Sequence, residues 1–216
     1  GMGGADYMAG GKGNDVFVVD NSGDTCNENP GEGRDTVQSS VTYTLAANLE
    51  ALALKGSAAI DGTGNELDNT LTGNAAANVL IGKAGNDRLV GGGGGDVLSG
   101  GAGNDTLTGG AGADTFRFDG VTAADAGRDL IVDFVHGEDV LQFERYYYGG
   151  VETNGALDPS HFVLGTKAGD ADDRMIYDKI TGSLWYDADG TGSQAQIRIA
   201  VLASHPDLEA SDLIFT

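Results

Sequence analysis

Aspartate recurs every nine residues through the middle of this 216-residue chain, in a pattern suited to binding hard metal ions. From residue 82 to 117 the sequence reads GKAGNDRLV, GGGGGDVLS, GGAGNDTLT and GGAGADTFR. The sixth position of each unit is aspartate, namely Asp87, Asp96, Asp105 and Asp114. Carboxylate and carbonyl oxygens together make the all-oxygen shell that suits Ca²⁺ better than Zn²⁺ or Mg²⁺. The spacing therefore predicts several calcium ions bound along this stretch.

Weaker copies of the unit flank the four clear ones. GNELDNTLT (64–72) and GNAAANVLI (73–81) continue the register backwards, with Asn69 and Asn78 in place of aspartate. Asn78 keeps an oxygen that can act as a ligand, whereas we expect none from Asn69. At the N-terminus GMGGADYMA, GGKGNDVFV and VDNSGDTCN lie in phase, and PGEGRDTVQ is displaced by two residues. These N-terminal units add four candidate ligands, which are Asp6, Asp15, Asp24 and Asp35.

Glycines fill positions 1, 2 and 4 of the better units. Without a side chain they permit backbone angles and close approaches that let six residues curl into a tight turn, with carbonyl groups pointing inward. Those carbonyls complete the candidate ligand set. The glycines selected for this role are Gly85, Gly92, Gly94, Gly101, Gly103, Gly110 and Gly112.

Short strands must hold these turns in place. The eighth position is always apolar between 82 and 117, and its neighbours are mostly polar or small, as in a half-buried strand. Two turns and two strands close a coil of 18 residues, so coils stack about 4.8 Å apart as in a parallel sheet. Asp87 then lies over Asp105, and Asp96 over Asp114. Carboxylates stacked in this way repel one another, and their turns hold few Lys or Arg residues, so a cation must lie between successive coils.

The nonapeptides resemble the glycine- and aspartate-rich repeats of RTX proteins, whose consensus binds Ca²⁺. Residues 128–141, RDLIVDFVHGEDVL, also resemble the RDxIxDFxxGxDxI stretch that follows the roll in serralysin-type C-terminal domains. The resemblance implies a parallel β-roll that folds on Ca²⁺ outside the cell. It also implies export by type I secretion machinery that reads an uncleaved C-terminal signal.

We therefore expect an all-β fold with two parts. Residues 1–117 form a parallel β-roll, a right-handed β-solenoid, with repeats at 1–38 and 64–117 and metal-free coils at 39–63. Residues 118–216 form a β-rich cap that also carries the secretion signal. In the cap we expect a hairpin-like pair at 129–143, a turn or short helix opened by Asp158, a hairpin at 174–187, and strands at 196–202 and 212–216.

Composition narrows the function classes. Twelve basic and 33 acidic residues give a net charge of −21, which disfavours nucleic acid and anionic membranes as partners. No apolar run approaches the ~20 residues of a membrane-spanning helix, so we expect no stable membrane insertion. The single cysteine, Cys26, occupies an apolar position of a repeat and is expected in the core. Because Gly1 precedes Met2, we expect the chain to begin inside a longer, secreted protein.

No sequence signal for catalysis is found. His136, His161 and His205 are scattered, with no HExxH, and GxSxG is absent. Residues 186–192, YDADGTG, resemble the opening of an EF-hand loop without its distal glutamate, which favours a plain polar turn over a separate calcium site. The run Tyr146–Tyr148 could meet a sugar or a partner, although packing of the cap is favoured.

Our first hypothesis is a non-enzymatic calcium-binding module that folds on extracellular Ca²⁺ and supports type I secretion. Its partners would be calcium ions and the secretion machinery. One alternative is a Ca²⁺-dependent adhesin whose cap binds a surface glycan, a matrix component or a protein. Another is the non-catalytic C-terminal appendage of a larger secreted hydrolase or epimerase.

Overall fold

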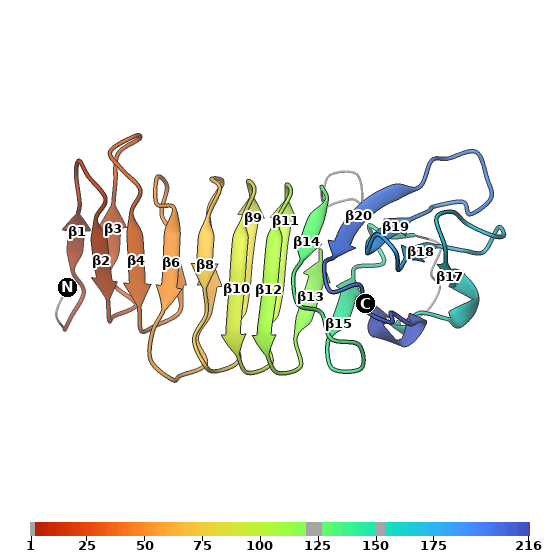
Figure 1. Ribbon diagram of the computed structural model, residues 1–216. Helices are drawn as coiled ribbons and strands as arrows, with labels where there is room; N and C mark the ends of the chain where they lie inside the picture. Colours follow the sequence, from red (N-terminus) through yellow and green to blue (C-terminus); the bar gives the residue numbers. More distant parts are fainter. Residues whose placement is uncertain (1–2, 120–126, 150–153) are drawn as a thin grey trace.

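The computed structural model describes residues 3–119, 127–149 and 154–216. Strands stack side by side into an elongated roll, with the N-terminus at one end and a more irregular cap at the other (Figure 1). Within the described residues the regular elements are short strands and two 3₁₀ turns, η1 (Pro159–His161) and η2 (Ala210–Asp212). The expected all-β fold is confirmed, and no described helix is long and apolar enough to cross a membrane.

One side of the roll is a sheet of 11 described strands that is parallel along the roll. Its strands, in spatial order from the N-terminal end, are β2 (Val16–Val19), β4 (Thr36–Ser39), β6 (Ala51–Leu54), β8 (Thr70–Thr72), β10 (Arg88–Gly93), β12 (Thr106–Ala111), β14 (Asp129–Ile131), β20 (Ile197–Leu202), β19 (Ser183–Tyr186), β18 (Met175–Asp178) and β17 (Phe162–Leu164).

The other side is a sheet of eight described strands. They are β5 (Tyr43–Thr44), β7 (Gly62–Thr63), β9 (Val79–Ala84), β11 (Val97–Ala102), β13 (Thr115–Phe118), β15 (Val140–Phe143), β21 (Leu213–Phe215) and β16 (Gly155–Ala156). At the N-terminal end β1 (Tyr7–Ala9) and β3 (Thr25–Asn27) pair with each other in parallel.

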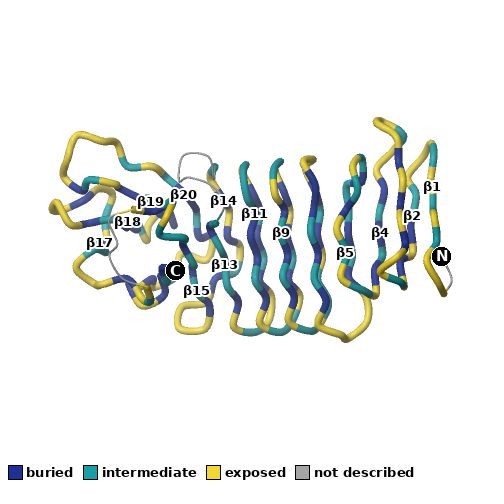
Figure 2. The backbone as a smooth tube through the Cα atoms, turned by 180° about the vertical axis from the view of Figure 1, so that it is seen from behind, coloured by how far each residue is buried: buried dark blue, intermediate teal, exposed yellow. Residues whose placement is uncertain are grey.

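The pairing register is the one that the repeat predicts. Leu89 pairs with Leu107, and Leu98 pairs with both Leu80 and Phe116, so residues 18 apart are neighbours. Between residues 82 and 117 the side chains of the eighth position are fully buried between the two sheets, because alternate residues of a strand point to the same face. Figure 2 shows buried segments along the whole roll and into the cap, whereas many turns and the outer loops of the cap are exposed. Cys26 is buried in this core, as expected.

The roll does not stop where the glycine-rich repeats end. β14 pairs in parallel with β12, and β15 pairs in parallel with β13. Farther along, β20 lies parallel to β14 and β21 parallel to β15. Residues 129–143 and two C-terminal strands thus add coils to the same two sheets.

The expectation of a hairpin-like pair at 129–143 is therefore wrong. β14 and β15 belong to opposite sheets, since the turn between them follows the path of the turns before it. Asp133 in this turn accepts hydrogen bonds from the backbone N–H groups of Gly109 and Gly110, at 2.9 and 3.0 Å. These contacts stack the turn on the preceding coil and separate the two strands.

The other secondary-structure expectations for the cap are confirmed, whereas two short strands, β16 and β17, were not expected from the sequence. Asp158 caps η1 by accepting a hydrogen bond from the Ser160 backbone N–H at 2.9 Å. β18 and β19 form the antiparallel hairpin expected at 174–187. β16 joins the eight-stranded sheet antiparallel to β21, and β17 extends the other sheet beside β18.

Truncation of a core leucine in the roll should be strongly destabilising. Leu98→Ala leaves a cavity between Leu80 and Phe116, and we expect a loss of about 2–5 kcal/mol in the free energy of unfolding. Leu67→Ala is the control, because Leu67 is 40% exposed, and it should change stability by less than about 1 kcal/mol. Denaturant unfolding at saturating Ca²⁺ measures both, and equal effects would contradict the assigned core.

Candidate metal sites

The aspartates of the repeats form two columns, one on each side of the roll. Each lies directly before a strand. Except at Asp24, whose N–H donates to the Asn21 carbonyl, the backbone N–H donates to a carboxylate one coil farther along. The Asp87 N–H donates to Oδ1 of Asp105 at 2.7 Å, and the Asp96 N–H donates to Oδ1 of Asp114 at 2.8 Å. The parallel register repeats this contact from coil to coil, so one oxygen of each carboxylate has a fixed direction.

The columns extend beyond the repeats into the cap. Asp129 Oδ1 accepts from the Asp105 N–H at 3.0 Å, and Asp139 Oδ1 accepts from the Asp114 N–H at 2.9 Å. Sequence reasoning missed both as candidate ligands. A signal was present, because Asp129 is the first residue of β14 and Asp139 directly precedes β15 within RDLIVDFVHGEDVL, yet their spacing departs from the nine-residue period.

Toward the N-terminus, asparagines end the clear columns. Oδ1 of Asn69 accepts from the Asn65 N–H at 2.7 Å, and Oδ1 of Asn78 accepts from the Asn74 N–H at 2.8 Å. The Asn78 amide group also donates to the Ile60 carbonyl at 2.6 Å. An amide offers both a donor and an acceptor, so these side chains are satisfied within the protein.

In the four clear repeats, the second oxygen of each aspartate is buried and has no hydrogen-bond partner. This holds for Oδ2 of Asp87, Asp96, Asp105 and Asp114, whose residues are at most 3% exposed. In the described part of the chain the salt bridges join Arg117 to Asp119, His136 to Asp212 and Lys179 to Asp207, all away from these carboxylates. Burying a charge without a partner is strongly unfavourable, so these oxygens fit a bound cation.

Burial also changes the acidity of the columns. Desolvation raises the pKa of Asp87 to about 7, and it raises the pKa values of Asp105 and Asp114 to about 6. Backbone hydrogen bonds act in the opposite direction but do not cancel the effect of burial. In the absence of a cation, protons would therefore bind these sites near neutral pH.

The seven glycines selected from the sequence lie in the same turns, and all have positive φ angles. Their φ angles are 112° at Gly85, 110° at Gly92, 96° at Gly94, 102° at Gly101, 138° at Gly103, 106° at Gly110 and 123° at Gly112. Two of them show why no side chain fits. A Cβ on Gly101 would lie 1.9 Å from the Lys83 carbonyl oxygen, and one on Gly103 would lie 1.9 Å from that of Gly85. The coils are thus stacked directly on one another's carbonyl groups.

Position 1 of the repeat, which was not selected as a ligand position, faces the free carboxylate oxygens. A Cβ on Gly82 would lie 2.2 Å from Oδ2 of Asp87 and 2.5 Å from the carbonyl oxygen of Gly100. A Cβ on Gly91 would meet Oδ2 of Asp96 and the carbonyl oxygen of Gly109 in the same way, at 2.3 and 2.5 Å. Carboxylate and carbonyl oxygens from successive coils therefore converge on one space, which is the donor set that Ca²⁺ requires.

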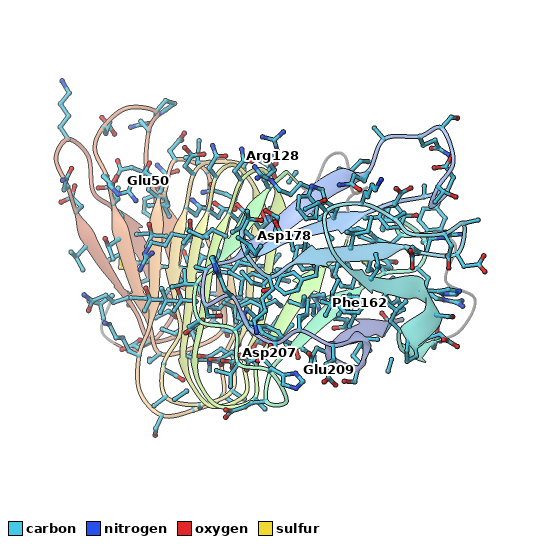
Figure 3. All side chains as sticks on the ribbon, turned by 45° about the vertical axis from the view of Figure 1, so that its right-hand side comes forward. Glu50, Arg128, Phe162, Asp178, Asp207 and Glu209 are labelled. Atoms are coloured by element: carbon cyan, nitrogen blue, oxygen red, sulfur yellow. The ribbon has the colours of Figure 1, made fainter. Side chains whose placement is uncertain are left out.

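The N-terminal candidates are arranged less regularly. The Asp6 N–H donates to Asp24 Oδ1 at 2.9 Å, and the Asp15 N–H donates to Asp35 Oδ1 at 2.8 Å. Glu50, labelled in Figure 3, continues the second of these columns, because its Oε2 accepts from the Asp35 N–H at 2.8 Å. Glu50 was not selected from the sequence.

The remaining candidates lie apart from the columns. Asp189 is held in a turn in which its N–H donates to Asp187 Oδ1 at 3.2 Å and its Oδ2 accepts from the Gln194 N–H at 3.1 Å. His136 and His205 are exposed, and His161 is half-buried. In the aromatic run, Tyr148 is fully buried in the cap, whereas Tyr146 is 85% exposed.

A roll of parallel coils with columns of buried, partly unpaired carboxylates defines a metal-binding β-roll. The family model of the RTX calcium-binding nonapeptide repeat matches this chain in four copies, at residues 1–26, 63–98 and 90–120. The chain therefore carries RTX repeats, and its metal is Ca²⁺.

Parts of this chain are similar to parts of known enzymes. An endo-1,3-1,4-beta-glycanase, ExsH, of Rhizobium meliloti (strain 1021) is 41% identical over 64 residues, or 30% of this chain. The match spans 14% of that glycanase. Among solved structures, the AlgE6R3 subunit of the Azotobacter vinelandii mannuronan C5-epimerase is 27% identical, with 69% of this chain and 78% of that chain covered and a TM-score of 0.45. The AlgE6R2 subunit of the same epimerase is 30% identical, with 73% of this chain and 92% of that chain covered and a TM-score of 0.43.

Acid should stabilise the metal-free roll and oppose calcium binding. The pKa of Asp87 is about 7 in the folded roll, against an ordinary value near 3.8, so the folded state binds more protons than the unfolded state between these limits. Stability without Ca²⁺ should therefore fall as the pH rises from about 4 to about 7. Over the same range the apparent Ca²⁺ affinity should rise, because protons leave the ligands.

Circular dichroism in chelator, and calcium titrations at several pH values, measure these two trends. Asp87→Asn should weaken the pH dependence of the metal-free roll. A β content in chelator that is the same at about pH 5 and pH 7.5 would contradict the assigned desolvation.

A methyl group at position 1 should block a calcium site directly. In Gly100→Ala the added Cβ would lie 2.1 Å from Oδ2 of Asp105, so the carboxylate has to move away from the ligand position. We expect the calcium midpoint for folding to rise by about tenfold or more. Gly165→Ala is the control, because its Cβ would have only one contact, at 4.0 Å. Equal midpoints for the two variants, read by circular dichroism, would show that position 1 does not border the site.

Proposed function

We propose that this chain is the calcium-dependent folding module of a larger secreted protein and is not itself the catalytic part. One observation carries the proposal. The carboxylate oxygens of Asp87, Asp96, Asp105 and Asp114 are buried without a partner, so folding at neutral pH depends on a bound cation. The sites exist only when coils are stacked, so the free energy of binding Ca²⁺ becomes free energy of folding.

The calcium gradient across a cell boundary then acts as the switch. In a calcium-poor interior, a chain of net charge −21 with uncompensated carboxylate columns stays extended. Extracellular calcium modules typically bind with dissociation constants of about 10⁻⁴–10⁻³ M, so the roll forms outside. Because each ion joins successive coils, filling one site orders the next, and the response to Ca²⁺ should be steep.

Burial of β21 is in keeping with export before folding. β21 is paired with β15, and Leu213 and Phe215 are completely buried in the folded protein. A secretion signal that included β21 would be accessible only while the chain is unfolded. The same module can accompany different catalytic parts, in keeping with a match that spans 14% of a glycanase.

A second candidate function is ligand binding by the cap. Tyr146 is 85% exposed and contacts Tyr147 edge to face, with ring centroids 5.0 Å apart. Exposed aromatic rings are suited to stacking on sugars or on a partner surface. A glycan array probed with and without Ca²⁺ tests this role, and Tyr146→Ala should abolish any signal that arises at this ring.

Calcium titration followed by far-ultraviolet circular dichroism tests the folding module. The chain should change cooperatively from coil to β structure, and Asp96→Ala and Asp105→Ala should shift the midpoint to higher Ca²⁺ by about tenfold, since each loses a ligand. Asp172→Ala is the control, because Asp172 is an exposed acidic residue of the cap. The same β content in chelator and in millimolar Ca²⁺ would refute the proposal.

A further inference from the structure

The first turn after β3 departs from the repeat in length and in its first residue. Val16 pairs with Thr36, so this coil has 20 residues, whereas Arg88 pairs with Thr106 across an 18-residue coil. The turn begins with Glu28, directly after β3 ends at Asn27. In the consensus units this place, position 1, is glycine.

The side chain of Glu28 takes the place of a backbone carbonyl. In a consensus turn, the space at Gly82 is bordered by Oδ2 of Asp87 and by the carbonyl oxygen of Gly100, one coil on. At the equivalent Gly10, a Cβ would lie 2.8 Å from Oδ2 of Asp15 and 2.5 Å from Oε2 of Glu28. A charged oxygen therefore stands where the other turns present a neutral one.

Asp35 completes the group. One carboxylate oxygen from each of Asp15, Glu28 and Asp35 lies within 4.8 Å of the other two. Glu28 is 5% exposed and Asp35 is completely buried. Oδ2 of Asp15, Oε2 of Glu28 and Oδ2 of Asp35 are all buried without a hydrogen-bond partner, and no salt bridge found in the described residues involves them.

The backbone holds these carboxylates in position through their other oxygens. Oε1 of Glu28 accepts from the Gly11 N–H at 3.0 Å, and Oδ1 of Asp35 accepts from the Asp15 N–H at 2.8 Å. The Glu28 carbonyl in turn accepts from the Asn48 side-chain amide at 2.9 Å. The free oxygens thus face one another in a fixed arrangement, which mutual repulsion would disrupt in the absence of a cation.

We propose that Asp15, Glu28 and Asp35 form a three-carboxylate calcium site that binds Ca²⁺ more tightly than the consensus turns and fills first. The inference rests on the proposed calcium-dependent function and adds Glu28 as a ligand outside the repeat consensus. The consensus space at Gly82 is bordered by one carboxylate oxygen, from Asp87, and one carbonyl oxygen, whereas three carboxylates meet at this site. Affinity for Ca²⁺ rises with the number of charged ligands and with the rigidity of the site, and both favour this turn.

A calcium titration of the full chain against a chromophoric chelator tests the order of filling. The unaltered chain should show one tight phase followed by a weaker set. Glu28→Gln keeps the shape and removes the charge, so the tight phase should weaken by about tenfold or more while the weaker set stays unchanged. Glu66→Gln is the matched control, because Glu66 is exposed, and it should leave both phases as they are.

Glu28→Gly provides a second variant that supplies the consensus residue at position 1. It should fold at saturating Ca²⁺ with an unchanged circular dichroism spectrum and should also lack the tight phase. If the chain binds Ca²⁺ but both Glu28 variants match Glu66→Gln, the three-carboxylate site is refuted and the calcium function stands. If the chain binds no Ca²⁺, the proposed function itself fails.

Discussion

Carboxylate oxygens buried without a protein partner are the constraint on which this structure depends. Each aspartate of the four clear repeats uses one oxygen to accept a backbone N–H from the preceding coil and leaves the other free, as Asp105 does with Asp87. The hydrogen bond fixes the register of the coils, and the free oxygen creates the need for a cation. Because stacking and metal binding use the same side chain, we expect each to stabilise the other at neutral pH.

The glycine content of the chain follows from the same constraint. Carbonyl groups of one coil occupy the space in which side chains of the next coil would lie, at Gly101 and Gly103 among others. Such close stacking places carbonyl oxygens beside the free carboxylate oxygens and makes a shell of oxygen ligands. The apolar eighth positions then supply a narrow core of single side chains, such as Leu89 and Leu98, which holds the two sheets together.

The cap is a continuation of the roll as well as its cover. Asp129 and Asp139 carry both columns forward, and β20 and β21 pair with the coil that contains them. Phe143 stacks between Phe118 and Phe215, with centroid distances of 4.9 and 5.2 Å, so one aromatic core crosses from the repeats into the C-terminal strands. Folding of the cap and filling of the last sites in the columns are therefore coupled. We expect this coupling to link calcium binding to the burial of β21.

The sequence by itself determined the parts of this protein that depend on a local period. Aspartate at position 6, an apolar residue at position 8 and glycine in the turns predicted the parallel register, the core and the aspartate columns, because a coil of 18 residues contains two exact repeats. Only the tertiary structure decided which residues join the columns where that period fails. Asp129 and Asp139 lie 24 and 25 residues beyond their partners, and Glu28 enters through a coil of 20 residues. The hairpin expected at 129–143 was wrong for the same reason, since its turn stacks on the preceding coil. Ligand positions in a roll depend on which residues lie above one another, and outside exact repeats only the stacked coils fix that alignment.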